Sequence, residues 1–137
     1  MYMKRIGILV FDGVEDLAVI GPARVFAAAA RLGADCLAST ISDHSPVICR
    51  LGTRLHVALR IDAAPPQDLL FVPAGVPFSH RRYLRLPHRR VVQVAGATAI
   101  EIAQRWVERL WGARVGRAVR IAMEPPRRVP SGVRGLF

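Results

Sequence analysis

The chain has 137 residues, 52% of them hydrophobic, and its twenty basic residues exceed its ten acidic ones to give a formal charge of +10. A chain of this length is expected to form one domain rather than several, and the apolar stretch behind Lys4 and Arg5 is too short for a signal sequence or a membrane span. We therefore expect a cytoplasmic protein with no membrane partner. Two cysteines without metal-ligand spacing favour reduced thiols, and neither a metal nor another cofactor is expected.

The first predicted elements are a buried strand and a helix. Residues 6–11 form an almost continuous apolar run, which is typical of a parallel strand covered on both faces. Asp12 and Gly13 predict a turn. Pro22 stands where the first turn of a helix tolerates proline, so the sequence predicts a helix over residues 23–32.

The cysteines and a second apolar run predict further strands. Cys36 lies near the expected start of a strand, and Cys49 follows another short one. A catalytic thiol needs a lowered pKa in an exposed, positively charged setting, whereas strand cysteines behave as small hydrophobes, so both are interpreted as structural. The run at residues 69–72 predicts a strong strand that ends in a turn at Gly75. This alternation of strands and helices predicts an α/β domain with a mainly parallel sheet.

The positive charge is concentrated in one half of the chain. Residues 1–78 are balanced, whereas residues 79–137 hold thirteen arginines against three glutamates and so carry the whole excess. Such asymmetry indicates either a polyanion partner or an arginine-rich codon usage, which nineteen arginines and one lysine favour. The dense segment 80–90 matches no nucleic-acid motif. A nucleic-acid partner is therefore an alternative that we do not favour.

The C-terminal part predicts two helices. Thr98 and Glu101 have the spacing of a capping box, and an apolar stripe follows at helical period until Gly112. A second helix is expected over residues 115–123. This helix carries a row of arginines at three-residue spacing, Arg114, Arg117 and Arg120, which could contact phosphates. We favour instead a helix that packs against the sheet.

Several segments, taken in order, resemble the ThiJ/PfpI family of the class I glutamine amidotransferase-like superfamily, in particular its isonitrile hydratase branch and the amidase-like domain of some AraC-type regulators. The resemblance extends over about four fifths of the chain, and the segments that carry it are 6–22, 35–42, 46–59, 63–75, 90–103 and 124–126. The resemblance implies a three-layer α/β sandwich with a flavodoxin-like, mainly parallel sheet. Because the family commonly dimerises, it also implies a homodimer.

The resemblance also shows what this chain lacks. Family members carry a nucleophile elbow, a cysteine on a strained strand-to-helix turn, after the turn that matches residues 73–75. Here only residues 76–88 separate that turn from the C-terminal block, and both cysteines precede it. The acid of the family's first loop falls on Ala18. The resemblance thus implies a fold truncated by loss of a central strand–helix unit, with no catalytic residue.

These observations define one domain over residues 1–137, made of an N-terminal half (1–75), a deletion junction (76–88) and a C-terminal helical block (89–137). We expect a degenerate domain without catalysis that binds a small molecule near Gly75, Asp16 and Ala18. Glu15 and Asp16 are otherwise interpreted as solvated acids before a helix. Two alternatives stay open: a fragment of an isonitrile hydratase-like lyase or amidase-like enzyme, and a regulatory or nucleic-acid-binding module that uses the basic half.

Overall fold

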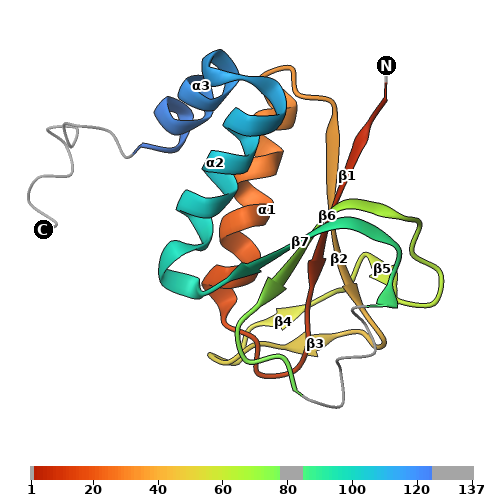
Figure 1. Ribbon diagram of the computed structural model, residues 1–137. Coiled ribbons are helices and arrows are strands. Elements are labelled where there is room, and N and C mark those ends of the chain that lie inside the picture. The colour runs from red at the N-terminus through yellow and green to blue at the C-terminus, as the bar shows by residue number, and fades with distance from the viewer. Residues whose placement is uncertain (1, 78–84, 125–137) are drawn as a thin grey trace, which may run out of the picture.

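The computed structural model describes residues 2–77 and 85–124, which form a five-stranded, parallel sheet covered by helices (Figure 1). The described residues do not include residues 78–84, which belong to the expected junction and to the arginine-rich segment. They also do not include the prolines after Glu124. The sheet has the order β5-β2-β1-β6-β7. Its strands are β1 (Lys4–Leu9), β2 (Cys36–Ser42), β5 (Leu59–Arg60), β6 (Gln67–Pro73) and β7 (His88–Val94). The other elements are α1 (Asp16–Arg31), the hairpin strands β3 (Val47–Ile48) and β4 (Arg54–Leu55), η2 (Gly96–Thr98), α2 (Ala99–Trp111) and α3 (Ala113–Met123).

Strand β6 is the most deeply buried element of the sheet. All seven of its residues are buried, because β1 and β7 flank it and both of its faces are covered. β7 pairs with β6 directly, from Gln67 opposite His88 to Pro73 opposite Val94. In the sheet formed by the described residues, no strand therefore lies between β6 and β7, and the C-terminal block begins with a strand rather than a helix.

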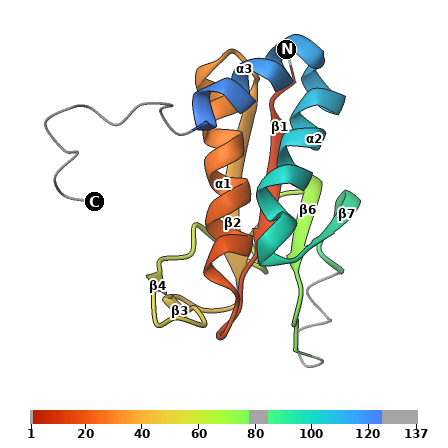
Figure 2. The same cartoon turned by 90° about the vertical axis from the view of Figure 1, so that its left-hand side faces the viewer.

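The two faces of the sheet are covered differently. Ile8 and Phe71 belong to the core beneath the helices, whereas Leu9 and Leu70 belong to a second core on the opposite face. All three helices lie on the first face (Figure 2), and the second core is closed by residues from loops such as Leu86. The predicted mainly parallel α/β fold is confirmed. In the described residues helices cover only one face of the sheet, so the third layer of the expected sandwich is not seen there.

Helix α1 begins seven residues earlier than predicted. It starts at Asp16, so Pro22 lies inside the helix and the predicted start was wrong. Tertiary contact explains the difference: a Cβ on Gly21 would lie 2.9 Å from Cγ1 of Ile100 in α2. Gly21 therefore allows a close contact between two helices, and the neighbouring Pro22 is buried. Tertiary packing thus outweighs the local preference of proline for a helix start.

Helix α2 forms where its apolar period predicts it, with Ala103 and Val107 fully buried. The predicted capping box is absent, because Thr98 ends the short helix η2 and makes no capping hydrogen bond from its side chain. Its hydroxyl donates to the Ala95 carbonyl at 3.4 Å instead. Glu101 pairs with Arg105 at 2.9 Å. Within the described residues, every helix is too short or too polar to cross a membrane.

Candidate functional site

The loops at the carboxyl ends of β6 and β7 line an open hollow of about 620 Å³. Ligands of open α/β sheets bind at this edge of the sheet. Gly75 has a φ of +88°, and nothing lies within 4 Å of the position that a Cβ would take, so the hollow is open beside it. The lining residues are Val72, Pro73, Ala74, Gly75, Val76, Gln93, Val94 and Ala95.

Asp16 lines a different hollow, of about 400 Å³, between the start of α1 and the loop after β7. It lies in the first helical turn, where negative charge is favourable, and accepts a hydrogen bond from the backbone N–H of Leu51 at 3.2 Å. A hydrogen bond from the Thr53 side chain is the main cause that lowers the pKa of Asp16. Asp16 is thus an ionised carboxylate that holds the β3–β4 hairpin, rather than a freely solvated acid.

Glu15 ties the first loop to the loop after β7. Its Oε2 accepts the backbone N–H of Gly96 at 3.0 Å, and its Oε1 lies 3.6 Å from Nη1 of Arg50. A Cβ on Gly96 would lie 2.4 Å from Oε2 of Glu15, so a larger residue there would require the Glu15 side chain to move. Glu15 is exposed and directly precedes α1, as expected of a solvated acid, but it also makes these two contacts. A contact across 81 residues of sequence leaves no local signal.

Ala18, at the position of the family's acid, lines neither hollow. It is 1% exposed and lies in the core beneath the helices. Asp16 and Ala18 therefore both lie on α1, and position 18 carries no carboxylate. Gly75 lies in the separate hollow at the end of β6.

Both cysteines have the surroundings of structural residues. The Cys36 thiol donates to the Phe26 carbonyl at 3.6 Å, and burial raises the pKa of Cys36 to about 11. Cys49 is 3% exposed, and burial raises its pKa as well. Since the thiolate is the reactive form, neither side chain is activated as a nucleophile.

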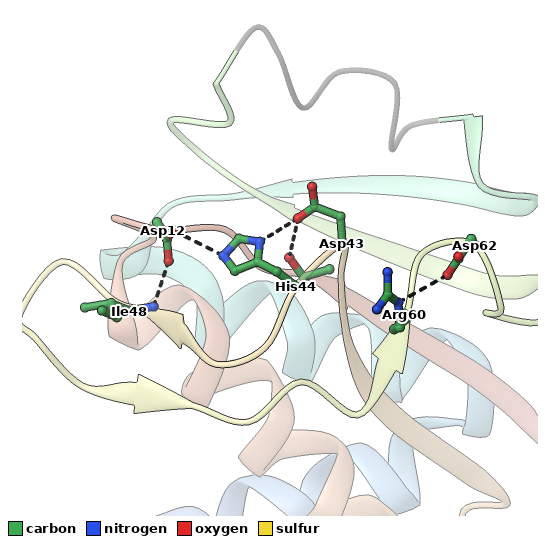
Figure 3. Close-up of polar contacts among 7 residues, drawn as sticks. Asp12, Asp43, His44, Ile48, Arg60 and Asp62 are labelled. Atoms are coloured by element: carbon green, nitrogen blue, oxygen red, sulfur yellow. Dashed lines mark hydrogen bonds and ion pairs between the residues drawn. The ribbon is translucent and has the colours of Figure 1, made fainter.

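A polar cluster around His44 was missed by the sequence analysis, which interpreted Asp12 as part of a simple turn. His44 contacts Asp43 from Nδ1 at 2.6 Å and Asp12 from Nε2 at 3.1 Å, and Asp12 also accepts the backbone N–H of Ile48 at 2.9 Å (Figure 3). The cluster joins the loop after β1 to the loop after β2. Nowhere in residues 2–77 and 85–124 are three or more His, Cys, Asp or Glu side chains arranged to hold a metal ion.

The His44 cluster predicts a pH-dependent contribution to stability. Hydrogen bonds to Asp43 and then Asp12 raise the pKa of His44 above 6.5. Protonated His44 therefore stabilises the fold fully below about pH 6.5, and this contribution is lost as the pH rises through the higher folded-state pKa. We expect the difference in melting temperature between the wild-type chain and His44→Gln to shrink over this window. The exposed His56→Gln variant is the control, and an unchanged difference between pH 5.5 and 8.5 would contradict the assignment.

The architecture of the described residues is shared by solved structures. No protein-family model matches the chain. A THiJ/PfpI family protein from Pseudomonas syringae superposes with a TM-score of 0.76 at 12% identity, over 99% of this chain and 85% of the other. DJ-1beta from Drosophila melanogaster gives 0.65 at 13%, over 89% and 98%, and an AraC family transcriptional regulator from Pseudomonas putida gives 0.67 at 16%, over 88% and 99%. The fold is thus that of ThiJ/PfpI and DJ-1 proteins, and the resemblance seen in the sequence is confirmed at this level.

One relative is similar in sequence as well. The "Uncharacterized protein in cpoL 5'region" of Streptomyces lividans is 39% identical over 102 residues, which are 74% of this chain and 67% of that protein. The chain belongs to the family of this Streptomyces protein.

Proposed function

We propose that this chain is a ThiJ/PfpI-like domain without catalysis that binds a small metabolite in the hollow at the ends of β6 and β7. The hollow of about 620 Å³ carries the proposal, because its volume is typical of small-molecule sites. Its lining residues are mostly apolar, such as Val76, and include the polar residue Gln93. That chemistry fits a small, neutral or weakly acidic ligand such as a carboxylic acid or an amide.

The absence of an activated nucleophile supports the non-catalytic part of the proposal. Both thiols of the chain lie outside the hollow and have raised pKa values. An isonitrile hydratase-like activity needs a thiolate that adds to the isonitrile carbon together with an acid that assists, and an amidase-like activity needs a comparable nucleophile. We keep these activities as the alternative. They would require a cysteine that the hollow of this chain does not contain.

The test of binding uses thermal shifts with a panel of small carboxylic acids and amides. A ligand at a hundred times its dissociation constant stabilises the folded state by about 2.7 kcal/mol, so we expect at least one member of the panel to raise the melting temperature. Ala95→Trp would fill the hollow and abolish that rise. Ala97→Trp lies two residues away, in the hollow of Asp16, and is the matched control that should keep it.

Two results would contradict this proposal. One is a panel without any thermal shift at concentrations up to the millimolar range. The other is a shift that survives Ala95→Trp and disappears in Ala97→Trp, which would place the ligand beside Asp16 instead.

A homodimer and a cytoplasmic location are also proposed. Leu17 and Ile20 are each nearly half exposed, one turn apart on α1, and Leu51 beside them is 85% exposed. Such an apolar group at the surface is typical of an interaction site. Light scattering on the purified chain would test the homodimer, and fractionation of cells would test the cytoplasmic location.

A further inference from the structure

Two arginine side chains approach one tryptophan, Trp106, between helix α2 and the edge strand β7. The guanidinium carbon of Arg109 lies 5.0 Å from the centre of the Trp106 ring, and that of Arg90 lies 5.8 Å from it. Arg90 comes from β7 and the other two from α2. The fold therefore brings together two guanidinium groups that are 19 residues apart in the sequence.

The two arginines beside Trp106 carry charge that no acid of the described residues compensates. Arg89 lies 3.7 Å from the Asp68 carboxylate, and Arg105 lies 2.9 Å from that of Glu101. In the part of the chain that the structure describes, no carboxylate lies within ion-pair distance of Arg90 or Arg109. The tryptophan ring attracts and orients the two guanidinium groups without neutralising them. Their N–H donors thus remain suited to a phosphate.

Two hollows share Trp106 and so form one strip across α2 and the start of β7. The larger, of about 580 Å³, follows α2, where Arg105 and Arg109 are separated by one helical turn, or about 6 Å along the axis. The smaller, of about 140 Å³, contains Lys4, Arg89 and Arg90. Since these last two residues begin β7, the strip lies far along the strand from the metabolite hollow at its carboxyl end. We call it the Trp106 strip.

We propose that the Trp106 strip binds single-stranded nucleic acid, with Arg90 and Arg109 on phosphates and Trp106 beside a base. Proteins that bind single strands without sequence preference combine a positive groove with aromatic side chains, and arginine adds cation–π contacts. A surface that is merely arginine-rich would not place its unpaired guanidinium groups around an aromatic ring. Arg120 of α3 illustrates the difference, since it is paired with Glu108 at 3.5 Å.

The test measures fluorescence anisotropy of labelled oligothymidylate and oligouridylate, each about twelve nucleotides long, at low salt. We expect Arg90→Gln/Arg109→Gln to weaken binding roughly tenfold or more, and to reduce the slope of log affinity against log salt by about 1.4, because two phosphate contacts are lost. Trp106→Leu should weaken binding by about tenfold through lost stacking while it leaves the salt slope unchanged. The DNA and RNA probes distinguish the two sources of a single strand.

The matched control is Arg24→Gln/Arg54→Gln, which removes the same charge from two exposed arginines outside the strip. It should weaken binding less than twofold. In a Trp111→Phe background Trp106 is the one tryptophan left, and its fluorescence should be quenched by the oligonucleotide. Equal weakening of both double variants would show general charge attraction and overturn the proposal. Absence of binding by the wild-type chain, unquenched Trp106, or a clear preference for duplex would overturn it as well.

Discussion

Replacing Phe26 by alanine is expected to destabilise the fold by about 3–5 kcal/mol. Phe26 is 1% exposed, and its ring makes edge-to-face contacts with Phe71, at 5.5 Å between centroids, and with Trp111, at 6.4 Å. It thereby joins α1 to the central strand β6 and to the end of α2. Its removal leaves a cavity that these three elements cannot close, because each is held by other contacts. Urea unfolding followed by circular dichroism measures the loss.

Leu32→Ala is the control for this prediction. Leu32 directly follows α1 and is 43% exposed, so its truncation should cost less than about 1 kcal/mol. A loss of under 1 kcal/mol for Phe26→Ala would contradict the view that the core beneath the three helices stabilises the sheet. If the loss equals the whole free energy of unfolding, the Phe26→Ala chain will show no cooperative unfolding transition. That result would also agree with this view of the core.

Asp68→Leu is expected to destabilise the fold by about 2–4 kcal/mol, because it removes the buried acceptor of two part-buried hydrogen bonds. The Asp68 side chain is 7% exposed; its Oδ2 accepts the backbone N–H of Arg5 at 2.7 Å, and its carboxylate accepts the Tyr2 hydroxyl at 3.1 Å. These bonds fix the start of β1 against β6 at the centre of the sheet. Leucine has a similar volume but cannot accept either bond.

Asp68→Asn separates hydrogen bonding from charge. The carboxamide oxygen can still accept the Arg5 N–H, so we expect less than half of the loss caused by leucine. Thermal unfolding of the three chains at pH 7 checks the order, wild type above Asp68→Asn above Asp68→Leu. Equal stability of wild type and Asp68→Leu would show that the buried carboxylate contributes nothing net to the fold.

Secondary-structure elements were predicted correctly from the sequence where their contacts are local in the chain or where their hydrophobic pattern is strong. β1, β6 and α2 follow from apolar runs and from a helical period, and the structure confirms them. The start of α1 was missed because the contact of Gly21 with Ile100 bridges two helices that are far apart in the chain. β7 was assigned to a helical block, because its exposed edge carries Arg89 and Arg90 instead of an apolar alternation.

The candidate sites were predictable only in part. Gly75 does line the hollow at the ends of β6 and β7, and its place follows from the turn after a strong strand. The roles of Glu15 and Asp16 depend on contacts with Gly96 and with the β3–β4 hairpin, which no local pattern indicates. The Trp106 strip likewise requires a strand and a helix to be packed together before its charges converge.

The most direct test of the non-catalytic assignment is the rate at which native Cys36 and Cys49 react with iodoacetamide as a function of pH. Burial raises the pKa of both thiols, so we predict that each reacts more slowly than free cysteine at pH 7 and gains reactivity only above about pH 9. Peptide mapping assigns the rate to each residue, and the urea-unfolded chain serves as the reference. A cysteine that reacts faster than free cysteine, with a midpoint below pH 8, would show an activated nucleophile and contradict the account.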